Sequence, residues 1–274
     1  MTLREIKRKS DQVYKDNREP ILSEYFLVGY VSLLAQYLRD GFFSFFVSLF
    51  LSPLSHGYVK HSIRLIDEEK PVLTYKDSLI GIFDFPRVAP VYLVKKAFVI
   101  IAMIVCAMPT LNIIKDKFST ISWKLVGELG NMLLQSDFLV PQLAKVTIIF
   151  NNVTILLNIA FCAIVYFIIS ALLMGVPYIM ELEDYSWSES FVLSMKMMKS
   201  HMFRYFGLCL SYSFRYMTYW LITGILLVTI GSFNEFFMLF CMVGSLFLYI
   251  EIFRARFELS KYLFYKEIKE RYEK

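Results

Sequence analysis

Six long apolar segments alternate with short charged stretches along this chain. Each segment is close to the roughly 20 residues that an α-helix needs to cross about 30 Å of hydrocarbon. The pattern therefore predicts an all-α protein, a polytopic transmembrane helical bundle with about six spans. The predicted spans are 21–38, 41–59, 97–114, 154–180, 205–230 and 236–253.

The same pattern divides the chain into a basic N-terminal segment (1–20), a membrane domain (21–257) and a charged tail (258–274). The first two spans are the least clearly separated, because Glu24 interrupts one and only Arg39 and Asp40 divide them. We predict two crossings there, and a re-entrant hairpin is the alternative. The tail places Glu267 four residues before Arg271, as in a solvated helix that continues the last span.

Composition supports the membrane prediction, since 57% hydrophobic residues exceed what a soluble domain of 274 residues can bury. Of the 29 basic residues, 23 fall in segments on one predicted side of the bilayer, which places both termini in the cytoplasm. The net charge of +5 follows this topology, so no nucleic-acid partner is expected. All four cysteines fall in predicted spans, which favours neither a disulfide framework nor a zinc site.

The segment from Trp187 to Phe203 is predicted to form an amphipathic helix whose capping box is Ser186 with Glu189. One stripe is apolar, the opposite side is polar, and basic residues follow in the last turns. Two interpretations are open: the helix lies in the membrane interface, or it packs on the ends of the spans. The residues concerned are Trp187, Phe191, Met195, Met198 and Met202 in the stripe, and Lys196, Lys199 and His201 among the polar ones.

Arg215 is the strongest candidate for a functional residue inside the bilayer. It lies ten residues after Tyr205, which corresponds to about 15 Å along a helix, where a charge is costly. Ser211 and Thr218 share its helix face. The acids expected to reach it are Glu24 and Glu251. This intramembrane polar site is interpreted either as a structural ion pair or as a site for a substrate or lipid headgroup.

Chemistry-bearing clusters are few. The acidic group Glu181, Glu183 and Asp184 could hold a cation, but its place before a capped helix favours a structural role. His56 and His61 have no accompanying metal-binding motif. No nucleophile, phosphate-loop or metal signature is present, so we expect no enzyme, no cofactor and no metal.

The run from Ser194 to His201, read with the run from Phe206 to Tyr212, resembles the signature of a bacterial integral-membrane family catalogued as domain of unknown function 975. Pro177-Tyr178, Glu183-Asp184 with Glu189, and Pro53-Leu54 with Gly57 are similar to other parts of the same pattern. The related membrane domain attached to glycerophosphodiester phosphodiesterases shares the approach to the helix. Ser200 and Phe214-Arg215 depart from the usual residues. The resemblance implies a multi-pass protein of the bacterial cytoplasmic membrane, with no assigned reaction.

Three function classes fit these observations. The first is a noncatalytic module that binds membrane lipids or a membrane protein partner. The second is a small transporter or permease subunit, which polar residues and prolines within the spans favour. The third, an intramembrane enzyme, ranks last because no catalytic set can be assembled from the sequence.

Overall fold

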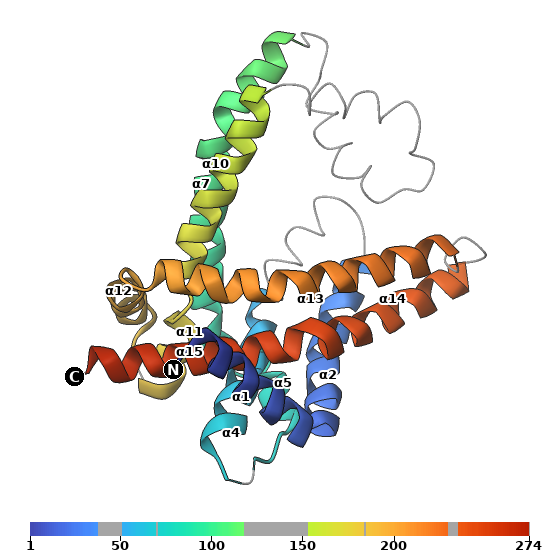
Figure 1. Ribbon diagram of the computed structural model, residues 1–274, viewed down its shortest axis with the longest axis vertical. Coiled ribbons are helices and arrows are strands. Elements are labelled where there is room, and N and C mark those ends of the chain that lie inside the picture. The colour runs from blue at the N-terminus through green and yellow to red at the C-terminus, as the bar shows by residue number, and fades with distance from the viewer. Residues whose placement is uncertain (38–50, 70, 118–152, 184, 230–234, 274) are drawn as a thin grey trace. The chain divides into compact units, whose positions relative to one another are not determined.

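The computed structural model describes residues 1–37, 51–69, 71–117, 153–183, 185–229 and 235–273. These residues form helices and no strand (Figure 1), which confirms the all-α prediction. The described chain divides into two compact units. One combines Met1–Lys95 with Ala171–Lys274, and the other is Lys96–Ser170.

Among the residues that the structure describes, two helical segments are long and apolar enough to cross a membrane. One is Phe85–Cys106, within α7 (Phe85–Lys117), and the other is Leu156–Glu183, which contains most of α10 (Val153–Leu172) and all of α11 (Val176–Glu183). They overlap the predicted spans 97–114 and 154–180. Large apolar side chains point outward on both, such as Val105 at 65% exposed and Leu157 at 66%. Such a surface is compatible with a lipid environment.

The second predicted span, 41–59, does not end as one continuous α-helix. Residues 41–50 lie outside the described part of the chain. After them comes a 3₁₀ turn, η1 (Ser52–Ser55), with a proline at its start, and then α4 (His56–Asp67). At the start of α4 the backbone packs closely against the backbone of Ser78. A Cβ added to Gly57 would lie 2.3 Å from the Ser78 carbonyl oxygen, so glycine is needed there.

The short helices α5 (Tyr75–Ser78) and α6 (Ile80–Phe83) lie against η1 and α4. They precede α7. On their other side stands α2 (Arg18–Tyr37), which covers the first predicted span. This arrangement buries the residues at the start of α4 between chain segments that are distant in sequence.

The charged tail is not solvated, so that part of the prediction is wrong. Helix α14 (Glu235–Tyr249) runs through a short π-helix, η2 (Ile250–Arg254), into α15 (Ala255–Tyr272). Apolar and aromatic residues of α15 are buried, because α1, α4 and α12 pack around it. The predicted pair of Glu267 with Arg271 is present at 2.7 Å. The tail is the central helix of the larger unit.

The basic N-terminal segment contains an amphipathic helix, α1 (Leu3–Asp16), that lies along α15 (Figure 1). A capping box formed by Thr2 and Glu5 begins it. Ile6, Ser10 and Tyr14 are its buried face, and Ser10 donates a hydrogen bond to the Arg256 carbonyl at 2.6 Å. These contacts place the charged side of α1 beside α13 (Met202–Thr229).

Candidate functional site

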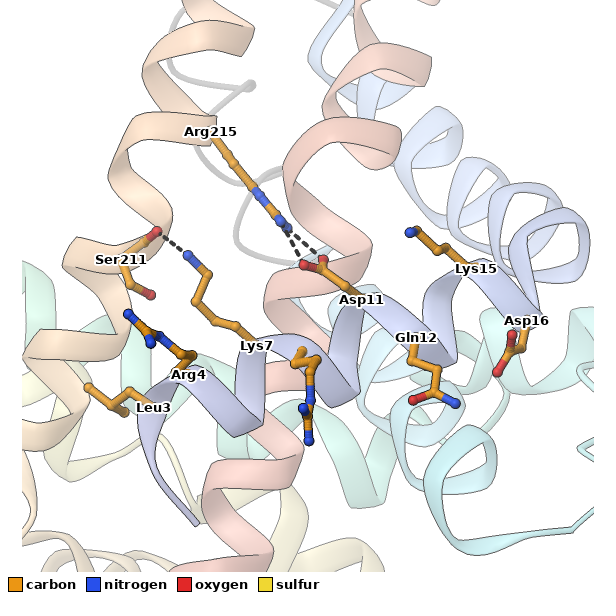
Figure 2. Close-up of a pocket in the computed structure, with 10 residues that line it drawn as sticks. Leu3, Arg4, Lys7, Asp11, Gln12, Lys15, Asp16, Ser211 and Arg215 are labelled. Carbon is orange, nitrogen blue, oxygen red and sulfur yellow. Dashed lines mark hydrogen bonds and ion pairs between the residues drawn. The ribbon is translucent and has the colours of Figure 1, made fainter.

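An open cleft of about 810 Å³ lies between α1 and α13 (Figure 2). Its lining is rich in charge, with cations outnumbering carboxylates. The basic members come from both helices, so the cleft exists only because α1 lies beside α13. The lining residues are Leu3, Arg4, Lys7, Arg8, Asp11, Gln12, Lys15, Asp16, Ser211 and Arg215.

Arg215 and Asp11 form the polar centre of this cleft. The two guanidinium nitrogens of Arg215 donate to the two carboxylate oxygens of Asp11, each at 2.8 Å (Figure 2). Arg256 of α15 lies 3.3 Å from the same carboxylate. Burial alone raises the pKa of Asp11, but the hydrogen bonds from Arg215 and the nearby cations outweigh it and hold the pKa below its usual value.

Lys7 adds a further cation one turn before Asp11 on α1. Its ammonium donates to the Ser211 carbonyl at 2.8 Å and lies 5.1 Å from the centre of the Tyr212 ring. The Arg215 guanidinium lies 5.3 Å from the same ring centre. Burial and then repulsion from Arg215 lower the pKa of Lys7. The cleft therefore concentrates positive charge that its two carboxylates, Asp11 and Asp16, do not balance.

The Tyr212 ring, which lies next to both cations, is held in place by α15. Tyr212 is fully buried, and its hydroxyl lies 2.7 Å from Ser260 Oγ. A second hollow, of about 440 Å³, continues the cleft toward η2 and is lined by Lys15, Glu251 and Arg256 as well as by Asp11 and Arg215. Glu251 accepts from Tyr14 at 2.5 Å and from Arg18 at 3.2 Å. The Glu251 carboxylate is therefore already bound by Tyr14, near the end of α1, and by Arg18, at the start of α2.

The structure corrects the predicted partner of Arg215. Neither Glu24 nor Glu251 pairs with it, because α1 supplies Asp11 instead. Ser211 and Thr218 flank Arg215 as predicted, but their hydroxyls bond back to carbonyls of α13, at 2.7 Å to Leu208 and 2.9 Å to Phe214. The interpretation placed Arg215 deep in the bilayer, whereas the charged helix α1 runs alongside this part of α13.

Sequence reasoning missed Asp11, Lys7 and Arg256 as members of the site. The signal for α1 was present: Thr2 and Glu5 have capping-box spacing, and Ile6, Ser10 and Tyr14 recur every four residues. The high charge of this segment does not by itself indicate a helix with a buried face. The contact of Arg256 with Asp11 crosses almost the whole chain, and no local pattern indicates it.

The helix predicted from Trp187 to Phe203 is α12 (Trp187–Met198), with the expected capping box, and it ends earlier than predicted. Its buried side is shifted from the predicted stripe. Phe191 and Met198 are buried, but Trp187 and Met195 are 46% and 40% exposed. The buried positions added by the structure are Ser190, Ser194 and Met197.

Buried serines explain why the buried side of α12 differs from the predicted stripe. Ser194 Oγ donates to the Leu172 carbonyl at 2.7 Å, and α12 packs on α11 and α15 through this side. Lys196 and Lys199 are exposed, as expected for the polar side. Met202 begins α13, and His201 stands in the turn before it. Burial lowers the pKa of His201. One face of α12 is therefore packed against other helices, as the second interpretation predicted. Trp187 and Met195 are exposed on another face.

The acidic cluster is divided between separate partners. Glu181 lies 3.1 Å from His56 Nε2 and 3.4 Å from Lys60. Glu183 pairs with Lys269 at 2.6 Å. Asp184 lies outside the described residues. Within the described chain, no group of three or more His, Cys, Asp or Glu is placed to hold a metal ion.

Ser78, His61 and Glu24 form a polar chain that the sequence did not suggest. Ser78 Oγ lies 2.7 Å from His61 Nε2 and donates to Glu24. The carboxylate contacts the serine rather than the second histidine nitrogen, and Ser78 and His61 are fully buried. A nucleophile needs a reachable substrate and a base oriented through its other nitrogen. These three residues do not have that geometry, and their contacts join α2, α4 and α5.

Comparison of the chain with protein-family models, with curated proteins and with solved structures finds no match. The site is therefore interpreted from its own geometry.

Proposed function

We propose that this chain is a noncatalytic, polytopic membrane module that binds an anionic lipid headgroup in the cleft between α1 and α13. The observation that carries the proposal is the charge of the cleft. Arg4, Lys7, Arg8, Lys15 and Arg215 line it together with two carboxylates, Asp11 and Asp16. Clusters of Lys and Arg at a membrane surface attract anionic lipids by about 1 kcal/mol for each residue.

The surface of α13 next to the cleft supports a lipid rather than a wholly soluble ligand. A row of exposed apolar side chains follows one face of α13 at spacings of three and four residues. Phe214, which directly precedes Arg215, is 76% exposed. Acyl chains could lie along this face while a headgroup occupies the cleft. The row consists of Phe206, Leu210, Phe214, Met217, Leu221 and Ile225.

Topology fits the same proposal. With about six spans and both termini in the cytoplasm, α1 lies at the inner surface, where anionic lipids attract basic segments. The resemblance of the segment from Pro177 to Tyr212 to the bacterial membrane family favours the cytoplasmic membrane of a bacterium. The Arg215 side chain reaches Asp11 of α1, which brings its charge toward the headgroups.

Native mass spectrometry of the detergent-released protein tests the proposal. The probe is a short-chain phosphatidylglycerol, compared with a short-chain phosphatidylcholine. Lys7→Leu and Arg215→Leu should each weaken phosphatidylglycerol binding by about fivefold, the effect of losing roughly one favourable charge contact. Lys9→Leu is the matched control, because Lys9 is an exposed residue of α1 that does not line the cleft.

Equal binding of the two lipids, or equal loss in Lys7→Leu and Lys9→Leu, would contradict the proposal. A copurified protein subunit that is lost from the Arg215→Leu sample would instead assign the cleft to a protein partner. Insertion and folding of every variant are checked first by gel filtration, so that a change in binding is not a change in recovery.

A further inference from the structure

We infer that Asp11 is a built-in competitor: its carboxylate occupies the position at Arg215 that the phosphate of a bound ligand takes, and binding exchanges one anion for the other. This inference rests on the proposed function and adds how the cleft is regulated. It assigns the ligand group as a phosphate, because a guanidinium with two parallel donors matches a phosphate as well as a carboxylate.

The first argument is the set of cations close to the Asp11 carboxylate. Arg215 and Arg256 both contact the Asp11 carboxylate, at 2.8 Å and 3.3 Å, and Lys7 lies against the same tyrosine ring as Arg215. Two cations thus contact one carboxylate, and a third, Lys7, lies nearby without pairing with it. The phosphodiester of phosphatidylglycerol carries one negative charge and two non-bridging oxygens, like the carboxylate of Asp11, so it can accept the same two parallel bonds from Arg215.

The geometry of Lys7 is the second argument. Its ammonium has three donors, and the described contact is one bond to the Ser211 carbonyl, with no ion pair to Asp11. Ser211 lines the cleft one helical turn from Arg215. Figure 2 shows Lys7 reaching from α1 to Ser211 and Arg215 reaching from α13 to Asp11, both across the space between the two helices. An oxygen placed there can accept from both.

Exposure makes the exchange physically accessible. The side chains of Asp11 and Arg215 are each 29% exposed, and both line the open cleft. The anchoring contacts of α1 are elsewhere on that helix. Tyr14 binds Glu251, and Ser10 binds the Arg256 carbonyl. Asp11 can therefore leave Arg215 by rotation of its own side chain, with α1 still in place.

Asp11→Asn is the decisive variant, since it keeps the shape of the side chain and removes the competing charge. Binding of short-chain phosphatidylglycerol should become about tenfold tighter if Asp11 leaves Arg215 free about one tenth of the time, because apparent affinity scales with the fraction of time that the site is free. Glu19→Gln is the control, because it removes one charge from an exposed position of α2 outside the cleft. It should bind as wild type. Asp11→Glu retains the charge and should also resemble wild type.

The outcomes separate the two proposals. Equal gains in Asp11→Asn and Glu19→Gln, or weaker binding in Asp11→Asn, would overturn the exchange while leaving the cleft as a lipid site. If Lys7→Leu and Arg215→Leu also change nothing, the proposed function fails as well. Where Asp11→Asn is not recovered folded, Asp11→Ala replaces it with the same expected gain.

Inorganic phosphate distinguishes the source of the phosphate group. Competition by millimolar phosphate against phosphatidylglycerol, stronger in Asp11→Asn than in wild type, would identify a free anion as sufficient. Binding of phosphatidylglycerol that resists phosphate would show that the acyl chains contribute, as expected if they lie on the exposed face of α13. Both results require Asp11 to be displaced, and the affinity of Asp11→Asn decides whether it is.

Discussion

The two compact units of the chain differ in how many charged residues they contain and in how those charges are paired. In the smaller unit, Lys96–Ser170, the stretches 97–114 and 153–170 carry no charged side chain. In the larger unit, α4 and α13 are joined to α15 by ion pairs and a buried hydroxyl contact. The comparison shows that one chain contains apolar helices suited to lipid and a polar helical assembly that must satisfy its charges internally.

The difference also explains what each unit can do. Apolar helices can anchor the chain in a membrane, but they offer little chemistry for recognising a ligand. The larger unit buries charge only where a partner is present, as for Glu258, which Arg254 contacts at 2.8 Å and Lys261 at 2.5 Å. Burial alone raises the pKa of Glu258, yet these two cations outweigh it and lower the pKa. The cleft at α1 is where this balance leaves positive charge in excess.

The largest predicted effect is acid weakening of the larger unit through His61. Burial lowers the pKa of His61 from 6.5 to about 4. The unfolded chain therefore takes up this proton as the pH falls through 6.5, whereas the folded chain resists until about pH 4. We expect a loss of about 3 kcal/mol in the free energy of unfolding between pH 7 and pH 4. Denaturant titrations in detergent at several pH values measure it.

His61→Gln is the control, because glutamine keeps a hydrogen-bonding group near Ser78 but does not titrate. Its stability should fall less than that of wild type over the same range, by the amount assigned to His61. Parallel curves for the two proteins would show that His61 already carries its proton in the folded state, and that the polar chain to Glu24 is an ion pair.

The sequence was sufficient for features that depend on local pattern. Apolar length predicted α7 and α10, and the capping box predicted where α12 begins. It failed for features set by packing between distant segments. The tail was read as solvated because its charges are frequent, yet Tyr262, Phe264 and Ile268 are buried. A helix surrounded by other helices can be buried on several sides while its charges pair with neighbours, so charge frequency does not measure exposure.

The candidate site shows the same division. Arg215 was found because a charge in an apolar run is conspicuous. Asp11 was not, since an acid among basic residues near a chain end has no local mark. Its importance arises only where α1 lies beside α13 and α15, a contact between segments separated by more than 200 positions in the chain.

A smaller effect is predicted for a charge placed in the apolar unit. Ile164 is 57% exposed on α10. Ile164→Lys should disfavour membrane insertion by about 2.5 kcal/mol if α10 crosses the bilayer, and less if the lysine reaches the interface. A glycosylation-mapping assay of insertion measures this, with Ile164→Leu as the control. Unchanged insertion of the lysine variant would mean that Ile164 faces water or protein rather than lipid.

The smallest effect is expected on the outer face of α13, which belongs to the larger unit but resembles the apolar helices. Leu210 is 60% exposed, whereas Leu208, two residues earlier, is fully buried. Leu210→Ala should change the free energy of unfolding in detergent by less than about 0.5 kcal/mol, as surface substitutions do. Leu208→Ala makes the same chemical change in the core and should cost about 2–5 kcal/mol.

Because the two substitutions are identical and share one helix, helix propensity cancels between them and the difference reports burial alone. A cost for Leu210→Ala near that of Leu208→Ala would show that another protein surface covers this face of α13 in detergent. Acyl chains could then not lie along it beside the cleft. A small cost for Leu210→Ala, together with weaker phosphatidylglycerol binding by the same variant, would place the acyl chains on this face and the headgroup at Arg215.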